Sequence, residues 1–332
     1  MTLATTLDPP LDHSLHKRQW PSPRLLAWSA ACVTLCASLS IAGYFAIQWR
    51  NTPPEAIVPI NWPEAAAPAA PSSQPELAPR KGRGLRPAPD PRLVEALPLG
   101  LLPKIGEDGT RPADRYARPP TPVSGAMVDA PRLAILITGG GIGHLATVEA
   151  MVKLPPDVSI ALSPYSSDID RQAADIRSEG HEIFLEMPVG KDGEPFGGAG
   201  PNELGDRFDA DINQTRLRWA MSRFAGYVGV SGHFSDRVKP DGNAMAALSE
   251  LGQRGLLLFD VGGDSGPSQL DTDLQSRAMD LQLQRLEEIA RQKGQAIGLA
   301  GTTPLAIDRL KNWSAGLAAR GFRLVPVSTL LH

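Results

Sequence analysis

Cysteine is nearly absent from this chain of 332 residues, and its placement excludes two kinds of framework. Both cysteines, Cys32 and Cys36, lie in one apolar stretch near the N-terminus. The rest of the chain therefore cannot hold a disulfide framework or a cysteine-based zinc site. An excess of charge of one sign is lacking too, because 33 Lys and Arg residues stand against 36 Asp and Glu residues. This balance gives no global case for nucleic acid as a partner.

Long apolar runs are also few, and the longest predicts a membrane anchor. Leu25–Trp49 contains no charged residue and is long enough to cross the roughly 30 Å hydrocarbon core of a bilayer. A buried core helix is the alternative, whereas a cleavable signal peptide has a shorter apolar core. Three basic residues shortly precede the stretch and one, Arg50, follows it. This asymmetry predicts a cytoplasmic tail over residues 1–24 and a periplasmic location, across a bacterial inner membrane, for everything after the anchor at 25–49.

Proline and glycine number 32 each, and the prolines crowd into the first 130 residues. From residue 50 to about residue 91 the chain is rich in Pro and Ala, a composition that buries too little surface to fold. We therefore expect a disordered linker over 50–91. Between 92 and 130, Leu, Ile and Tyr are mixed with turn residues, which predicts an ordered arm packed on a domain that spans 131–332.

Apolar strand patterns and amphipathic helical patterns alternate after residue 131. This alternation predicts an α/β fold with parallel strands and crossover helices. Seven strands fit either a doubly wound sheet or an incomplete barrel, and the pattern alone does not choose between them. The predicted strands are Leu133–Thr138, Val158–Leu162, Glu182–Glu186, Tyr227–Ser231, Leu256–Asp260, Ala296–Leu299 and Phe322–Val327.

The domain is organised around the stretch R-L-A-I-L-I-T-G-G-G-I-G-H, residues Arg132–His144. Its unbroken apolar run predicts a strand buried on both faces, followed by a glycine turn that opens a helix. Chemistry in such folds lies beyond the carboxyl ends of the strands. The glycines allow backbone N–H groups to approach a phosphate or carboxylate, although the spacing matches no known phosphate loop. A tight turn with close backbone packing is the alternative.

Several strings after this stretch resemble the divergent polysaccharide deacetylase family. The resemblance covers about residues 130–330 in family order. Its strings are L-A-I-L-I-x-G-x-G, L-P-P-D-V-S-I-A-L-S-P-Y, G-H-E-I-F-L-E-M-P, G-Y-V-G-V-x-G-H-F, G-L-L-L-F-D, G-Q-A-I-G and R-L-V-P-V-S. The resemblance implies a distorted (β/α)7 barrel. It also implies removal of an acetyl group from a sugar, by a divalent metal such as zinc with a carboxylate as base.

The chain departs from the family pattern at the positions that carry this chemistry. Thr138-Gly139 stands where the family has an Asp-Asp pair, and Glu186 stands where it has a histidine. Leu299-Ala300-Gly301 replaces a G-H-P-like turn. Of the implied ligands, His233 remains in place, with Asp260 at the end of the fifth strand. The acidic pair and most of the implied histidine ligands are therefore missing.

The candidate site residues follow from these positions. The resemblance and the strand ends single out His233, Glu186 and Asp260 as a catalytic set, and as the metal ligands if a metal is bound. His181 precedes its strand and is excluded, because it lies at the opposite end from the chemistry. The glycine turn and the loop after the fourth strand supply the substrate-binding candidates, which are Thr138, Gly139, Gly140, His144 and Asp236.

Two functions remain open from the sequence. The first is a membrane-anchored hydrolase that deacetylates an envelope glycan with a rearranged metal site. The second is a catalytically inactive relative that keeps the sugar cleft and works as a binding or scaffold module. Loss of the acidic pair removes the base and a ligand together, so no cofactor is expected unless the first function holds. The expected partners are an envelope polysaccharide or peptidoglycan fragment, the inner membrane and a periplasmic protein.

Overall fold

The computed structural model describes residues 85–191, 198–263, 266–271 and 276–331. The predicted cytoplasmic tail, the predicted anchor and most of the predicted linker lie outside these residues. Within them, no helix is both long enough and apolar enough to span a bilayer. The main sheet has eight strands, which in chain order are β3 (Arg132–Gly140), β4 (Ser159–Leu162), β5 (Ile183–Glu186), β6 (Gly229–Gly232), β7 (Leu257–Asp260), β8 (Ser268–Gln269), β9 (Gln295–Gly301) and β10 (Arg323–Leu324).

Every strand pair in this sheet is parallel, as the alternating pattern predicts. The strand order is β7-β6-β5-β4-β3-β9-β8, and β10 pairs with the start of β3. In the described part of the chain β7 and β8 are the two ends of this order, so the sheet is an open half-barrel. This agrees with the incomplete barrel that the sequence allows, and the distorted (β/α)7 barrel is corrected only in its strand number, because the two-residue β8 was not predicted. The predicted strand Phe322–Val327 is reduced to β10, because Pro326 lacks an N–H and a 3-10 helix follows it.

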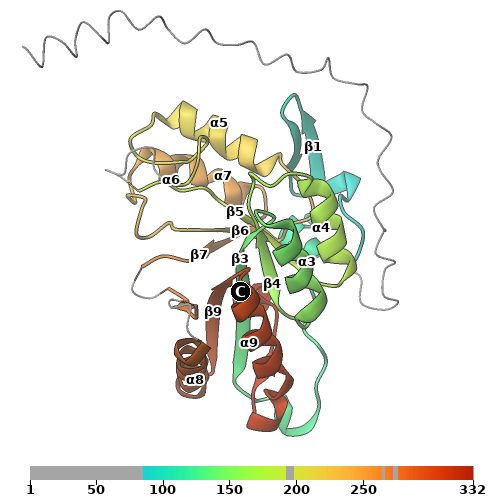
Figure 1. Ribbon diagram of the computed structural model, residues 1–332. Coiled ribbons are helices and arrows are strands. Elements are labelled where there is room, and N and C mark those ends of the chain that lie inside the picture. The colour runs from blue at the N-terminus through green and yellow to red at the C-terminus, as the bar shows by residue number, and fades with distance from the viewer. Residues whose placement is uncertain (1–84, 192–197, 264–265, 272–275, 332) are drawn as a thin grey trace, which may run out of the picture. The chain divides into compact units, whose positions relative to one another are not determined.

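Helices connect the strands and cover the sheet (Figure 1). α3 packs beside α9, α9 beside α8, and α5 beside α6, while α4 covers β4 and β5. The helices are α2 (Pro112–Tyr116), α3 (His144–Lys153), α4 (Ile169–Ser178), α5 (Ala210–Met221), α6 (Asn243–Leu248), α7 (Glu250–Gln253), α8 (Ser276–Lys293) and α9 (Pro304–Ala315), with 3-10 turns at Pro91–Leu93, Gly125–Met127, Ala318–Arg320 and Val327–Leu330.

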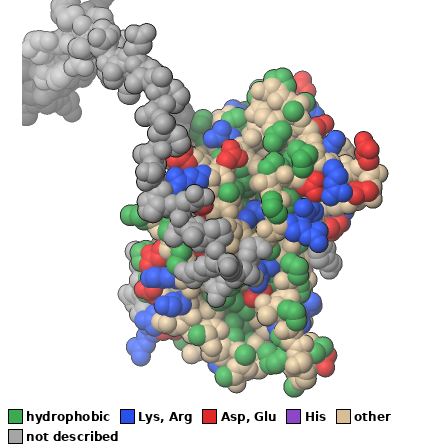
Figure 2. Space-filling view, turned by 90° about the vertical axis from the view of Figure 1, so that its right-hand side faces the viewer, with side chains coloured by type: hydrophobic (Ala, Val, Ile, Leu, Met, Phe, Trp, Pro, Cys, Tyr) green, Lys and Arg blue, Asp and Glu red, His purple; other side chains and the backbone are tan. Residues whose placement is uncertain are grey.

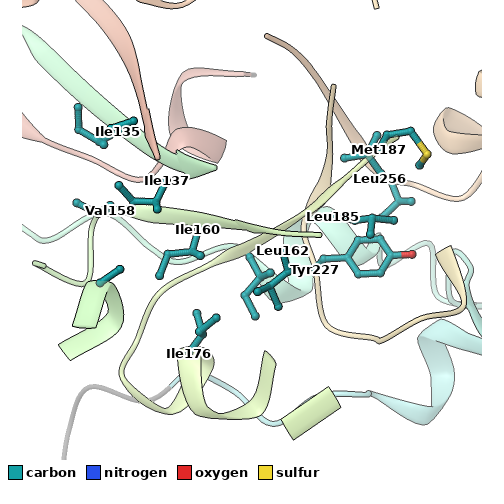
Figure 3. Packing of buried hydrophobic residues seen from close by; sticks show 14 of the residues in the cluster. Ile135, Ile137, Val158, Ile160, Leu162, Ile176, Leu185, Met187, Tyr227 and Leu256 are labelled. Carbon is teal, nitrogen blue, oxygen red and sulfur yellow. The ribbon is translucent and has the colours of Figure 1, made fainter. Parts of the chain in front are cut away.

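The apolar run of β3 is unbroken because both faces of the sheet are buried. Alternate residues Ile135 and Ile137 belong to one core, together with Ile160 and Leu162 of β4 and Ile176 of α4 (Figure 3). The residues between them belong to a second core on the opposite face, with members that include Ala134, Leu136, Phe184, Phe259, Tyr116 and Val327. This second core is closed by the arm and by the C-terminal segment, which is how the arm becomes part of the folded domain.

The arm begins with the hairpin of β1 (Val94–Leu97) and β2 (Gly100–Pro103) and continues through α2. Arg177 of α4 fastens it, because its guanidinium donates to the carbonyl oxygens of Tyr116 (3.2 Å) and Arg86 (2.8 Å). The N–H of Leu85 in turn donates to the carbonyl of Arg177 at 3.1 Å. Residues 85–91, expected in the disordered linker, are therefore held against the domain.

Basic and acidic side chains alternate on the face that Figure 2 shows, which is the right-hand side of Figure 1. Apolar side chains are scattered among them. The arm and α4 lie on that side of the molecule in Figure 1. Among the described residues visible on that face, no broad surface carries a single charge sign.

Candidate functional site

A cavity of about 500 Å³ lies at the carboxyl edge of the sheet. The ends of β3, β5 and β6 supply Thr138, Glu186 and Ser231 to its wall, and the loops after β4 and β6 supply further side chains. Its polar lining consists of Thr138, Ser163, Tyr165, Glu186, Ser231, His233, Arg237 and Gln269. The predicted location of the chemistry, beyond the carboxyl ends of the strands, thus coincides with a built cavity.

Glu186 ends β5 and reaches this cavity from a mostly buried position. Its Oε2 accepts a hydrogen bond from the N–H of Gly139 at 3.3 Å, the one hydrogen bond the structure gives this carboxyl among the described residues. Burial raises the pKa of Glu186, and the Gly139 hydrogen bond offsets only part of that rise. A carboxyl with few donors and a raised pKa is suited to receive a ligand or to exchange a proton.

Ser231 and Arg237 line the same cavity and are absent from the sequence-based candidates. Ser231 is in register with Glu186 across β5 and β6, and is only 1% exposed. Its hydroxyl has no hydrogen-bond partner among the residues that the structure describes. Arg237 donates from Nη1 to the carbonyl of Val189 at 2.9 Å, whereas its buried Nε has no hydrogen-bond partner within the described ranges. The period-2 spacing of Ser231 and His233 is the signal that points to Ser231, because alternate residues share a face.

His233 lines the cavity, as predicted, and is partly exposed. Its Nδ1 lies 3.2 Å from Oδ2 of Asp236, which is itself exposed at the rim and does not line the cavity. The same Asp236 oxygen lies 3.9 Å from Nε of Arg237. Asp236 therefore lies between His233 and Arg237 and orients His233 from outside the cavity.

Asp260 ends β7 as expected, but its carboxylate is engaged by the backbone. Oδ1 accepts the N–H groups of Phe234 and Gly262, both at 3.0 Å, and Oδ2 accepts the N–H of Ser235 at 3.2 Å. Burial alone acts to raise the pKa of Asp260, but the hydrogen bonds from Ser235, Gly262 and Phe234 outweigh it and lower the pKa. Asp260 thereby fixes the loop that carries His233, and it does not line the cavity.

The residues do not fit the divalent metal that the family resemblance implies. In the described ranges no group of three or more His, Cys, Asp or Glu side chains is placed to hold a metal ion. The expected set of His233, Glu186 and Asp260 is not assembled, because Asp260 directs both oxygens to backbone N–H groups. A carboxylate ligates a divalent metal through oxygen lone pairs, and the backbone N–H groups occupy three of those of Asp260.

The glycine turn after β3 serves close backbone packing more than the binding of a phosphate or carboxylate. Thr138 lines the cavity and its hydroxyl donates to the carbonyl of Ala300 at 3.4 Å. Gly140 is buried so closely that a Cβ would lie 2.6 Å from the carbonyl oxygen of Ala161. His144 is exposed at the first turn of α3 and lies outside the cavity lining, as do Gly139 and Gly140. Of the five predicted substrate-binding residues, Thr138 alone reaches the cavity wall.

Comparison with known proteins agrees with the sequence strings. A structure of an uncharacterized protein from Agrobacterium tumefaciens is similar to this chain at 31% identity and a TM-score of 0.64, over 70% of this chain and 99% of that one. A pseudoenzyme of the CE4 family (16% identity, TM-score 0.41, 61% of this chain and 68% of that one) and a peptidoglycan deacetylase from Bdellovibrio bacteriovorus (10%, 0.39, 63% and 58%) are more distant. A search of curated proteins finds no match. The profile of the divergent polysaccharide deacetylases matches residues 135–331, and the chain belongs to that family.

Proposed function

We propose that this protein binds a segment of polysaccharide in the cavity at the carboxyl edge of its sheet, and that it does so without metal-dependent hydrolysis. Family membership supports the carbohydrate ligand. The observation that carries the non-catalytic part is the state of Asp260, whose two oxygens accept three backbone N–H groups. The protein is then a binding or scaffold module built on a deacetylase fold.

The lining of the cavity suits a sugar ring. Thr138, Ser163 and Ser231 line the cavity and carry hydroxyl groups, as a sugar does. The ring of Tyr165 packs against that of Trp219 with centroids 5.2 Å apart and planes tilted by 40°, and its hydroxyl accepts the N–H of Asn202, so its phenol is held in a fixed position at the wall. Sugar sites combine such fixed polar groups with apolar surface.

Hydrolysis is the second candidate, and Glu186 is the observation that favours it. A mostly buried carboxyl with a raised pKa resembles a general acid or base. Deacetylation also requires stabilisation of the charge that develops on the acetyl oxygen, which the family accomplishes with a metal. The described residues offer no group of ligands for one.

The test uses the full chain with N-acetylated oligosaccharides such as chitotetraose. We expect saturable binding by calorimetry, no release of acetate, and metal well below one equivalent. His233→Ala is expected to weaken binding, whereas His144→Ala is the matched control, because this exposed histidine lies outside the cavity. Acetate release that disappears in Glu186→Gln and requires one equivalent of metal would establish the hydrolase instead.

We further propose that the domain works outside the cytoplasm, tethered to the inner membrane, on an envelope polysaccharide or a peptidoglycan fragment and with a periplasmic protein partner. This rests on the uncharged stretch Leu25–Trp49 and on the basic residues before it. Deleting 25–49 is expected to move the protein from the membrane fraction to the soluble fraction. Protease added to spheroplasts is expected to digest the domain of the intact chain; a protected domain would contradict the orientation.

A further inference from the structure

Two residues that line the cavity at the carboxyl edge each carry a buried polar atom with no hydrogen-bond partner among the described residues. One is the hydroxyl of Ser231 on β6, and the other is Nε of Arg237 in the loop that follows. Buried polar groups in folded proteins are nearly always hydrogen-bonded, and leaving one unpaired costs about 1–3 kcal/mol. Two such atoms on residues that line one cavity therefore point to a partner that comes from outside the chain.

No acceptor among the described residues forms a hydrogen bond with either of these two atoms. The carboxylate of Asp236 lies 3.9 Å from Nε of Arg237, beyond hydrogen-bond distance, and its Oδ2 lies closer to His233, at 3.2 Å. Asp236 is also exposed, so water screens its charge. The carbonyl of Val189 accepts only from Nη1 of Arg237. The guanidinium thus reaches the cavity with its charge weakly compensated.

The chemistry of these groups specifies the missing ligand group. The guanidinium only donates hydrogen bonds, and the hydroxyl of Ser231 is free to donate, so the ligand must present acceptor oxygens. A carboxylate matches the planar fork of an arginine and gains a charge-assisted hydrogen bond. Arg237 is the one Lys or Arg among the described residues of the lining.

We propose that the cavity selects a sugar that carries a carboxylate, of the hexuronic acid class, with the carboxylate held by Arg237 and Ser231. This inference rests on the proposed function, because it names the class of glycan that the same cavity binds. Glu186, in register with Ser231 on the neighbouring strand, accepts a hydroxyl of the sugar and sets the other side of the ligand.

The experiment measures binding of three probes to the full chain by calorimetry: trigalacturonate, its methyl ester and neutral chitotriose. The ester keeps the sugar skeleton and removes the charge. We expect trigalacturonate to bind at least about tenfold more tightly than its ester, since a hydrogen bond to a charged group contributes about 1.5–3 kcal/mol. Arg237→Gln is expected to abolish this preference, with Arg285→Gln, on the exposed face of α8, as the matched control.

Ser231→Ala is a second variant that is expected to fold, because the hydroxyl it removes has no hydrogen-bond partner among the described residues. It is expected to weaken binding of trigalacturonate about fivefold, as loss of a single hydrogen bond predicts. Equal affinity for the acid and its ester, or an unchanged preference in Arg237→Gln, would overturn the inference. If chitotriose binds while the acid has no advantage, only the inference fails; if none of the three probes binds, the proposed function fails as well.

Discussion

Glu182 immediately precedes β5 and Glu186 ends it, and the two carboxyl groups have opposite surroundings. Glu182, at the amino edge of the sheet, is 0% exposed. Oε1 accepts the hydroxyl of Ser159 (2.7 Å) and the N–H of Ser328 (3.0 Å), while Oε2 accepts the hydroxyl of Ser328 (2.6 Å) and the N–H of Arg118 (3.2 Å). Glu186, at the carboxyl edge, accepts one N–H.

This difference separates a carboxyl that holds the fold from one that is available to a ligand. Glu182 joins the end of the arm, β4 and the C-terminal segment, so its acceptor positions are filled by the chain itself. Glu186 faces a cavity with its acceptor positions mostly open. Asp260 shows that position alone does not decide the role, because it lies at the carboxyl edge and is nevertheless filled by backbone donors.

The largest effect is expected from Glu182→Ala. This change leaves two hydroxyls and two backbone N–H groups without their acceptor, and we expect it to lower the free energy of unfolding by about 3–5 kcal/mol. Urea denaturation at neutral pH measures it. Glu186→Ala is the control and should cost below about 1 kcal/mol. Equal losses in the two variants would remove the distinction drawn between the two ends of β5.

Asp260→Ala is expected to lower the free energy of unfolding by about 2–3 kcal/mol, because three backbone N–H groups lose their acceptor. Amide exchange at Phe234 and Ser235 should accelerate at the same time. The lowered pKa means that this stabilisation is present above the ordinary pKa of 3.8 and is lost as the pH falls through the lowered value. If wild type and Asp260→Asn still differed in free energy of unfolding at the lowest pH, the stabilisation could not come from the Asp260 carboxylate as an acceptor of backbone N–H groups.

Glu186→Gln is expected to raise the free energy of unfolding at pH 8. A raised pKa in the folded state contributes stability that is full below the ordinary value of 4.5 and is lost as the pH rises through the raised value. Glutamine removes the buried charge, so its advantage should vanish near pH 4. Thermal unfolding across this pH range tests the sign, and a variant that is less stable at pH 8 would show that the charge is compensated.

Ser231→Ala is expected to raise the free energy of unfolding of the unliganded protein by about 1–3 kcal/mol, because it removes a buried hydroxyl that has no hydrogen-bond partner among the described residues. Ser159→Ala, at the amino edge, is its matched counterpart and should cost about 1–2 kcal/mol, since its hydroxyl donates to Glu182. Urea denaturation of both variants measures the contrast. A large loss in Ser231→Ala would mean that its hydroxyl serves the fold.

Local patterns in the sequence were sufficient for most of the fold. The apolar run of β3 predicts burial on both faces, and glycines at strand starts predict helix ends: Gly180 and Gly255 have positive φ, 97° and 71°. The two-residue β8 and the open edge of the sheet were not predictable in this way. They depend on which strands pair, and pairing between distant segments leaves no local periodicity.

The sequence predicted the location of the site better than it predicted the roles of the individual residues. Glu186, His233 and Thr138 were expected at the carboxyl edge and lie there. The role of Asp260 could not be predicted from its place at a strand end. Its carboxylate accepts backbone N–H groups, and every residue except proline has such a group, so the sequence does not show which of them will reach Asp260. Arg237 was missed because a loop arginine is ordinarily solvated, and only the fold shows that its Nε is buried.

The attachment of Arg177 has a mechanical consequence. A pull on the chain from its N-terminal side enters the described domain at Leu85, whose N–H is bonded to the backbone of α4. The guanidinium of Arg177 donates hydrogen bonds to the carbonyl oxygens of Arg86, Tyr116 and Gly226. A force on the chain is therefore distributed to the arm and to the segment before β6. The hairpin and the cavity lie downstream of this clamp. If the chain is tethered as proposed, tension reaches α4 through these hydrogen bonds before it reaches the strand ends that line the cavity.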